Sequence, residues 1–305
     1  MRIDEILAGR DAPVLSFEFF PPRTDEGEQK LGQAVERLAA LEPDFFSVTW
    51  GAGGSTSERT VSLTAELQER FGPRGMAHLT CVGASVDSLH ASVRTIRDAG
   101  IDNVLALRGD PPAGEEAFVK RDDGLAHASE LAKLVSDDYD LFVAGACYPE
   151  THQEAPDAVT DVQHLRRKVD AGAGVLITQL FYDNRDYFAL VEAARDHGID
   201  VPIIPGILPA TDQGRLERIT GLCGARIPEP LHAQMEACDA PESVRELGIA
   251  YAAQQCAELL AAGAPGIHFY TINDAGPTAA IVGALRAARP WERAWDSRQL
   301  AMRSR

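Results

Sequence analysis

The stretch VLSFEFF (residues 14–20), followed by GEQKLGQAVERLAAL (residues 27–41), joins two hydrophobic patterns that predict different local structures. Residues 14–20 are a short, nearly continuous apolar run, which is typical of a strand buried on both faces. Residues 27–41 place apolar side chains three and four positions apart, which is typical of a helix that covers a buried surface. A strand followed by such a helix is the repeating unit of parallel α/β sheets.

The same pattern recurs along the chain. Apolar runs rich in β-branched and aromatic residues predict eight strands, at residues 14–20, 44–50, 76–82, 103–108, 141–147, 175–181, 201–207 and 266–271. Helical periodicity lies between them, for example at 86–100 and 161–173, and several such segments end in glycine. Eight strand-then-helix units predict an α/β fold of the (β/α)8 TIM barrel type. Residues 208–262 are too many for one helix, so we expect an extra helical insertion around 208–262. We expect 1–305 to form a single catalytic domain of this barrel type.

Composition excludes several classes of protein. Hydrophobic residues make up 45% of the chain and charged residues 25%, which is unlike disordered or membrane-inserted chains. The net charge of −17 disfavours binding to nucleic acid, and an anionic ligand would need a locally basic pocket. Five cysteines without CxxC spacing and an N-terminus unlike a signal peptide predict a cytoplasmic protein with no metal site.

Polar residues gather where the predicted strands end, and in such barrels the chemistry lies at that rim. Nearly every strand supplies one: they include Glu18, Thr49, His78, Thr80, Arg108, Gly109, Asp110, Tyr148, His152, Gln179, Tyr270, Thr271 and Asn273. The pattern therefore predicts one site that is shared by most strands.

Glu18 stands in the middle of an apolar run. Burial disfavours the charged form of a carboxyl group, so we expect a raised pKa that suits Glu18 to donate a proton near neutral pH. The alternative is a structural acid that is paired with an arginine or with backbone donors.

Other motifs leave two interpretations open. In LRGDPP (107–112), Arg108 and Asp110 either form an ion pair that closes a turn, or bind a phosphate and the ring of a ligand. His78 is either a core histidine or a ligand contact, and the YPETH loop (148–152) either packs or binds. The stretch GAGGST (51–56) is not a dinucleotide-binding fingerprint.

Taken together, the motifs closely resemble those of the 5,10-methylenetetrahydrofolate reductases, in particular the catalytic barrel of the bacterial type. The resemblance rests on SFEFFPPR (16–23), SVTWGAGG (47–54), HLTC (78–81), ALRGDPP (106–112), YPETH (148–152), RRKVDAGA (166–173), ITQLFYD (177–183), IPGILP (204–209) and HFYTIN (268–273). It implies a barrel that binds FAD and reduces methylenetetrahydrofolate to 5-methyltetrahydrofolate with NADH or NADPH. The implied mechanism is a ping-pong hydride transfer that feeds methionine synthesis.

The resemblance also implies roles for individual residues. Glu18 would be the catalytic acid that opens the imidazolidine ring of the folate, and Asp110 would lie near both flavin and pterin. The substrate would be contacted by Glu18, Asp110, Gln179 and Ile219. The flavin would be held by Thr49, His78, Arg108, Gly109, Asp110, Tyr148, His152, Asp161 and Lys168. Arg108 and Lys168 would supply the basic pocket for its pyrophosphate.

Two positions depart from the family pattern. Asp274 follows HFYTIN where many relatives carry a basic residue, which puts a contact to acidic groups of the ligand in doubt. Ile219 stands where some relatives present an aromatic residue.

Three alternatives stay open at this point. The first is direct hydride transfer from NAD(P)H to the folate without flavin, and the second is a folate-binding barrel without turnover. The third, a lyase with a Schiff-base lysine, is disfavoured because no lysine falls in a predicted strand. The sequence does not distinguish NADH from NADPH, and we expect a homo-oligomer.

Overall fold

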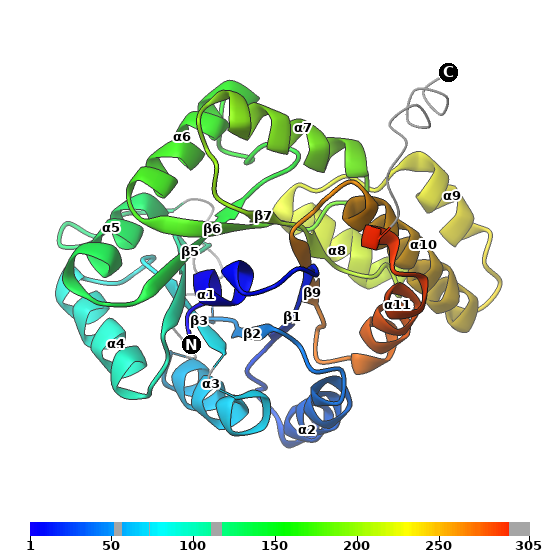
Figure 1. Ribbon diagram of the computed structural model, residues 1–305, viewed down its shortest axis with the longest axis horizontal. Coiled ribbons are helices and arrows are strands. Elements are labelled where there is room, and N and C mark those ends of the chain that lie inside the picture. Colours follow the sequence, from blue (N-terminus) through cyan, green and yellow to red (C-terminus); the bar gives the residue numbers. More distant parts are fainter. Residues whose placement is uncertain (52–56, 73, 111–117, 293–305) are drawn as a thin grey trace.

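The strands form one parallel sheet that curves into a nearly closed barrel (Figure 1). The computed structural model describes residues 1–51, 57–72, 74–110 and 118–292. Within these ranges the strands are β1 (Val14–Phe19), β2 (Phe45–Val48), β3 (Gly75–Thr80), β4 (Asn103–Leu107), β5 (Phe142–Cys147), β6 (Ala173–Thr178), β7 (Ile203–Ile204), β8 (Gly206–Ile207) and β9 (Gly266–Tyr270). Their order is β7-β6-β5-β4-β3-β2-β1-β9-β8. The predicted barrel is confirmed.

Helices surround the strands and connect one to the next (Figure 1). They are α1 (Ile3–Ala8), α2 (Asp25–Ala39), α3 (Ser57–Phe71), α4 (Val86–Asp98), α5 (Ala128–Asp138), α6 (Ala158–Asp170), α7 (Asn184–Asp196), α8 (Gln213–Cys223), α9 (Glu229–Glu236), α10 (Pro241–Ala261) and α11 (Ala275–Ala288), with a 3-10 turn at Pro290–Glu292. The stretch between β8 and β9 contains α8, α9 and α10.

The seventh predicted strand, 201–207, differs from the prediction because it is divided into β7 and β8 at Pro205. Proline has no N–H group to donate to a neighbouring strand. The Pro205 carbonyl accepts instead from the His268 backbone N–H at 2.9 Å. β7 pairs with β6 and β8 pairs with β9, so this one segment lies at both ends of the strand order and brings the barrel near to closure.

Helix α1 covers the end of the barrel where the strands begin (Figure 1). Its Ile3 and Ile6 are buried together with Val14, Phe45 and other inward-facing residues of the strands. The Ile3 N–H donates to the buried Asn103 side chain at 2.9 Å, which attaches the helix to β4. This end is filled by apolar side chains, so the chemistry is left to the other end.

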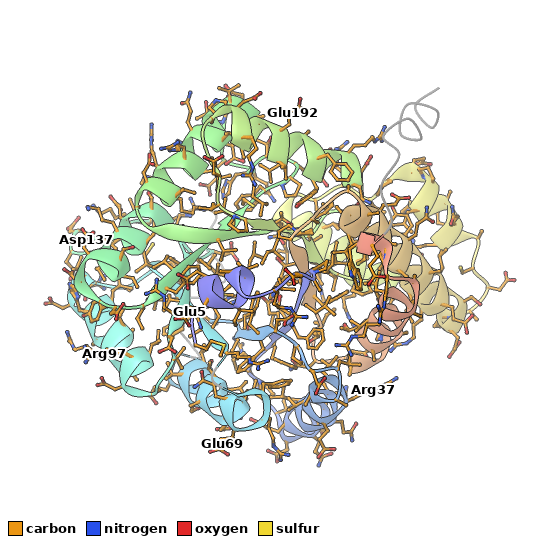
Figure 2. The ribbon with its side chains drawn as sticks, viewed as in Figure 1. Glu5, Arg37, Glu69, Arg97, Asp137 and Glu192 are labelled. Atoms are coloured by element: carbon orange, nitrogen blue, oxygen red, sulfur yellow. The ribbon has the colours of Figure 1, made fainter. Side chains whose placement is uncertain are left out.

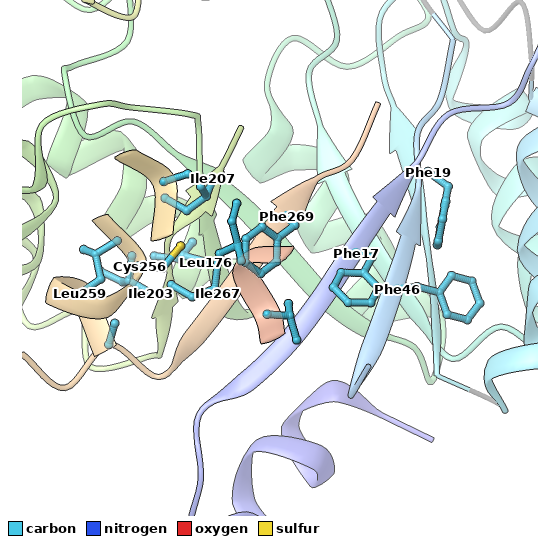
Figure 3. Packing of buried hydrophobic residues seen from close by; sticks show 14 of the residues in the cluster. Phe17, Phe19, Phe46, Leu176, Ile203, Ile207, Cys256, Leu259, Ile267 and Phe269 are labelled. Carbon is cyan, nitrogen blue, oxygen red and sulfur yellow. The ribbon is translucent and has the colours of Figure 1, made fainter. Parts of the chain in front are cut away.

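The outer faces of the strands pack against the ring of helices. Phe17, Phe19 and Phe46 are fully buried in this layer (Figure 3). Phe20, directly after β1, is by contrast 38% exposed.

Charged side chains cover the outside of the helical ring. Figure 2 shows Arg37, Glu69, Arg97, Asp137 and Glu192 on the outward faces of five helices, and all five are exposed. Among the helices described, none combines the length and apolarity that crossing a membrane requires.

Candidate active site

The alternation of side chains along each strand places a polar layer inside the barrel, above the apolar end. On β1, Phe17 and Phe19 face the helices, so Ser16 and Glu18 face inward. The strand register pairs Ser16 with His268 of β9 and Glu18 with Ser47 of β2. Pairing between strands that are distant in the sequence thus assembles the layer.

Glu18 is surrounded by two histidines and a serine. Its Oε2 lies 3.3 Å from His78 Nε2, 3.5 Å from His268 Nε2 and 3.5 Å from Ser47 Oγ, which donates to it. Glu18 is 4% exposed, His78 6% and His268 1%, so this contact group is closed to most solvent. The His78 Nε2 atom is close to the carboxylate but is not oriented for a hydrogen bond, and it has no other partner among the described residues.

The expectation of a raised pKa for Glu18 is wrong for the ligand-free protein. Burial does raise the pKa, but the interactions of the carboxylate with the two neighbouring imidazoles, His268 and His78, outweigh it and lower the pKa to about 2. Glu18 is therefore ionised at neutral pH until a ligand or a proton changes its surroundings. The alternative of pairing with an arginine is also not what the structure shows, because the partners are imidazoles.

The last residues of HFYTIN hold the backbone of Glu18 and Phe20. Thr271 Oγ1 donates to the Glu18 carbonyl at 2.6 Å. The Asn273 side chain accepts from the Phe20 N–H at 3.0 Å and donates to the Phe20 carbonyl at 2.8 Å. Ile272 and Asn273 adopt positive φ of 48° and 54°. Positive φ is unusual for a β-branched residue such as Ile272. The strained turn after β9 thus fixes the end of β1.

Arg108, at the end of β4, has a partner that the sequence did not reveal. Its guanidinium group binds both carboxylate oxygens of Glu154, with Nη2 to Oε1 at 2.7 Å. It also lies over the ring of Phe118, 4.9 Å from the centroid. Of the two interpretations of LRGDPP, the ion pair with Asp110 does not form among the described residues, where the ion-pair partner of Arg108 is Glu154.

Four more predicted residues form a half-buried group beside Arg108. The rings of Tyr148 and His152 meet edge to face, with centroids 4.6 Å apart, and the His152 N–H donates to Asp161 at 2.9 Å. Burial and the charge of Arg108 lower the pKa of His152. Lys168 donates to the Ala146 carbonyl, and burial lowers its pKa. No carboxylate of the described chain lies within ion-pair distance of Lys168.

The remaining predicted residues lie at the same rim. Thr49 follows β2 and its N–H donates to the Phe19 carbonyl at 3.0 Å, while the Gln179 N–H donates to the Cys147 carbonyl at 2.7 Å. Asp110 is exposed directly after Gly109. Gly109 has φ of 87°, and a Cβ there would lie 2.5 Å from Val82. Residues 52–56 of GAGGST and the prolines of LRGDPP lie outside the described residues.

A small pocket opens beside the turn after β9. It is lined by Leu208, Pro209, Thr211, Arg215, Tyr270, Thr271, Ile272, Asp274, Pro277 and Thr278. Asp274 accepts from the Gly276 N–H at 3.0 Å and pairs with Arg245 at 2.8 Å, so it caps α11 and joins it to α10. Ile219 lies on α8, packed against the cluster that includes Leu216 and Leu231.

Sequence reasoning missed four residues of these groups: Ser16, Ser47, His268 and Glu154. Alternation along β1 places Ser16 on the same face as Glu18, two positions away. Ser47 and His268 could be found only from the strand register, which pairs them with Glu18 and Ser16. Glu154 gave no signal, since its partner is 46 residues away in the chain.

Comparison with known proteins agrees with this arrangement. The sequence profile of the family described as methylenetetrahydrofolate reductase matches residues 2–286. "Methylenetetrahydrofolate reductase (NADH) 1" of Zea mays is 39% identical in an alignment of 290 positions that covers 89% of this chain and 48% of the maize protein. The "5,10-methylenetetrahydrofolate reductase" of Escherichia coli (strain K12) is 38% identical over 268 residues, 88% of either chain. The chain spans about half the length of the plant relatives that it matches.

One solved structure shares the fold over nearly its whole length. It is described as an uncharacterized protein from Clostridium thermocellum that binds two copies of 5-methyl-5,6,7,8-tetrahydrofolic acid. The TM-score is 0.66 with 17% sequence identity, over 94% of this chain and 98% of the other. At this identity the likeness shows the fold alone.

Proposed function

Because the chain belongs to the methylenetetrahydrofolate reductase family, we propose that it reduces 5,10-methylenetetrahydrofolate to 5-methyltetrahydrofolate with NADH or NADPH and bound FAD, as a step toward methionine synthesis. The observation that carries the proposal is the ionisable layer of Glu18, His78 and His268 at the open end of the barrel, beside a separate cationic group. The test is oxidation of NADH or NADPH that depends on added methylenetetrahydrofolate and yields 5-methyltetrahydrofolate.

The residues of the rim fit a flavin nucleotide. Arg108 and Lys168 would hold its phosphates, and Lys168 is a half-buried cation whose only described partner is a carbonyl. Tyr148 and His152 supply an aromatic surface beside these cations. FAD, when bound, would take a hydride from the nicotinamide and return it to the methylene carbon of the folate. The rival mechanism, in which hydride passes directly from NAD(P)H to the folate, assigns no role to these two cations and two aromatic rings.

Within this proposal, Glu18 delivers a proton to the ring nitrogen of the folate that departs when the imidazolidine ring opens. Bound folate would remove the remaining water from Glu18, and loss of water raises the pKa of a carboxyl group. His78 and His268 contact the carboxylate, and Thr271 and Asn273 keep the end of β1 in place. The site thereby combines a positioned acid with a fixed backbone.

Replacing Glu154 with glutamine is expected to tighten FAD binding by about three- to tenfold, since a charge-assisted pair with Arg108 competes with the anionic cofactor. Glu154 is 55% exposed at its side chain, so the variant is expected to fold. The measurement is titration of the flavin-free protein with FAD, followed by flavin fluorescence at two salt concentrations.

Glu150→Gln is the matched control, because Glu150 lies in the same loop but pairs with Arg226 instead. Its FAD affinity should stay near that of the unmodified protein. Weaker FAD binding in Glu154→Gln would show that Glu154 supports the cofactor and does not compete with it.

We place the acidic end of the folate at the pocket beside the turn after β9, because an arginine lines it. Arg215 lines it, and among the described residues its side chain has no hydrogen bond or ion pair, although its charge acts on Asp274. Thr278 Oγ1, which is buried and without a partner among the described residues, lines it as well. Asp274, which pairs with Arg245, stands where many relatives carry a basic residue. Within this proposal, Arg215 supplies the positive charge instead.

Arg215→Met is expected to raise the KM for methylenetetrahydrofolate about tenfold with little change in kcat, because one charge-assisted contact to a carboxylate is lost. Arg218→Met, one turn further along α8 at an exposed position, serves as the control. Steady-state kinetics with the folate varied makes the comparison. An equal rise of KM in both variants would place the acidic end elsewhere.

A further inference from the structure

Helix α8 presents one face to the rim of the barrel. Arg215, Ile219 and Cys223 follow one another at a spacing of one helical turn, so their side chains share this face. Arg215, near the start of the helix, lines the pocket beside the turn after β9. At the other end, burial raises the pKa of the Cys223 thiol, and the nearby charges of Glu150 and Asp110 add to the effect. The face therefore runs from the pocket to the neighbourhood of Asp110, which follows β4.

Arg226, shortly after the end of α8, joins this helix to two other elements. Its backbone N–H donates to Glu150 Oε2 at 2.8 Å, and its Nε donates to the same oxygen at 3.0 Å. Its Nη2 donates to both carboxylate oxygens of Asp186 on α7, at 3.1 Å and 3.0 Å. The side chain of Glu150 is 9% exposed and that of Asp186 is 21% exposed, whereas that of Arg226 is 71% exposed. One guanidinium group thus bridges two shielded carboxylates from different elements.

The two carboxylates need the cation that lies between them. Burial raises the pKa of Glu150 and the charge of Asp186 adds to this, while Arg226 acts in the opposite direction. Without Arg226 the two acids would repel each other, and the end of α8 would lose its charged contacts to both elements. A further bond to α8, from Gln153 Nε2 to the Leu222 carbonyl at 3.1 Å, joins two exposed residues and is a weak substitute.

The loop after β5 that Arg226 contacts also carries the group that we assign to the flavin. Tyr148 and His152 of this loop form an edge-to-face pair, and Glu150 between them pairs with Arg226. Thr151 has φ of 73°, a value that few residues other than glycine adopt, so the chain turns sharply within this loop. The same short loop therefore fixes the position of α8 relative to the aromatic pair.

We propose that Arg226 is a positioning residue for the folate, because it fastens α8 to the loop after β5 and so holds the face with Arg215 toward the ligand. The inference rests on the proposed reductase function, in which Arg215 binds the acidic end of the folate. A helix that is held only at its first turn can tilt and rotate, and a displacement of about 1 Å is enough to weaken an oriented contact. Arg226 is engaged by its two carboxylates, so it acts through α8 and does not touch the ligand.

Arg226→Met is expected to raise the Kd for 5-methyltetrahydrofolate and the KM for methylenetetrahydrofolate at least about fivefold, with kcat and the Kd for FAD changed by less than about twofold. Arg226→Lys keeps the charge, but one ammonium group cannot bridge both carboxylates, so it should recover little of the affinity. Arg166→Met is the matched control. Arg166 also connects elements, since it donates to Asp170 and to the carbonyls of His197 and Gly198, but it does so at the end of the barrel where the strands begin. It should lower stability without changing either folate constant.

A double-mutant cycle with Arg215→Met separates positioning from direct attraction. If Arg226 acts through α8, the two changes together should raise the Kd for 5-methyltetrahydrofolate by clearly less than the product of the single effects. Calorimetric titration of the FAD-saturated protein measures this Kd without turnover. Effects that multiply, full affinity in Arg226→Lys, or lower stability with unchanged folate constants would overturn the proposal. If the unmodified protein bound 5-methyltetrahydrofolate but did not reduce methylenetetrahydrofolate, the reductase function would fail, and the Kd comparison would still decide the role of Arg226.

Discussion

Replacing Glu18 with glutamine is expected to slow the folate step by roughly 10²–10⁴-fold, the usual contribution of a positioned general acid. The amide keeps the size of the side chain but supplies no acidic proton to the nitrogen that leaves the methylene carbon. Reduction by NADH needs no such proton and should stay within about twofold of the unmodified rate. Anaerobic stopped-flow measurement of the two half-reactions separates these effects.

Glu66→Gln is the control for charge removal, because Glu66 is exposed and pairs with Arg59 on α3, outside the barrel. Both half-reactions should be unaffected in it. If Glu18→Gln retained the full folate rate, Glu18 would not be the acid, and a barrel that binds folate without using this residue would become the better account.

The second large effect concerns stability. Phe46→Ala is expected to lower the free energy of unfolding by about 3–5 kcal/mol, because a fully buried ring is removed from a close-packed layer. Phe46 lies 5.1 Å from Phe71 and 6.4 Å from Phe19, centroid to centroid, where β2 and β1 meet α3 (Figure 3). Urea unfolding at a fixed, saturating FAD concentration measures the loss.

Phe20→Ala provides the comparison. Phe20, like Phe46, is the second residue of a Phe-Phe pair, but its side chain is 38% exposed. It should change the free energy of unfolding by no more than about 0.5 kcal/mol. Phe46→Leu should fall between the two. A loss below about 1 kcal/mol for Phe46→Ala would mean that the layer rearranges to fill the space, contrary to the packing seen.

The architecture could be predicted from the sequence because its signals are local. Strands buried on both faces read as apolar runs, and the helices between them read as 3.6-residue periodicity, so β1 begins at Val14 and α4 begins at Val86 as predicted. The break at Pro205 could also have been anticipated, since proline supplies no N–H to a sheet. That the two halves would pair with strands on opposite sides depends on closure of the barrel, which no local pattern reports.

The chemistry of Glu18 could be predicted only in part. The apolar run indicated burial, which the structure confirms, and burial alone would raise the pKa. His268 reverses this result from 250 residues further along the chain, through the β1–β9 register that places it next to Ser16. Single-sequence reasoning assigns neighbours along the chain, not across strands, so the sign of the shift was out of its reach.

Asp274 and Arg108 illustrate the same limit for charged groups. Asp274 departs from the family pattern, yet its position before α11 makes it a helix cap, and its pairing with Arg245 needs the packing of α10 on α11. For Arg108, an ion pair with Asp110, two residues away, was one of two interpretations, and the structure pairs it instead with Glu154 of the following βα loop. In both cases the residue type predicted a charge contact, and only the fold determined the partner.

The central claim is that one barrel takes a hydride from a reduced pyridine nucleotide onto bound flavin and gives it to methylenetetrahydrofolate. The most direct test is anaerobic: the purified, FAD-saturated protein is mixed with NADH and then with methylenetetrahydrofolate, while the visible flavin band is recorded. The account predicts that NADH bleaches the band and that the folate restores it, with 5-methyltetrahydrofolate formed in equal amount. A band that NADH bleaches but methylenetetrahydrofolate does not restore, or NADH oxidation that proceeds at full rate with folate in flavin-free protein, would contradict it.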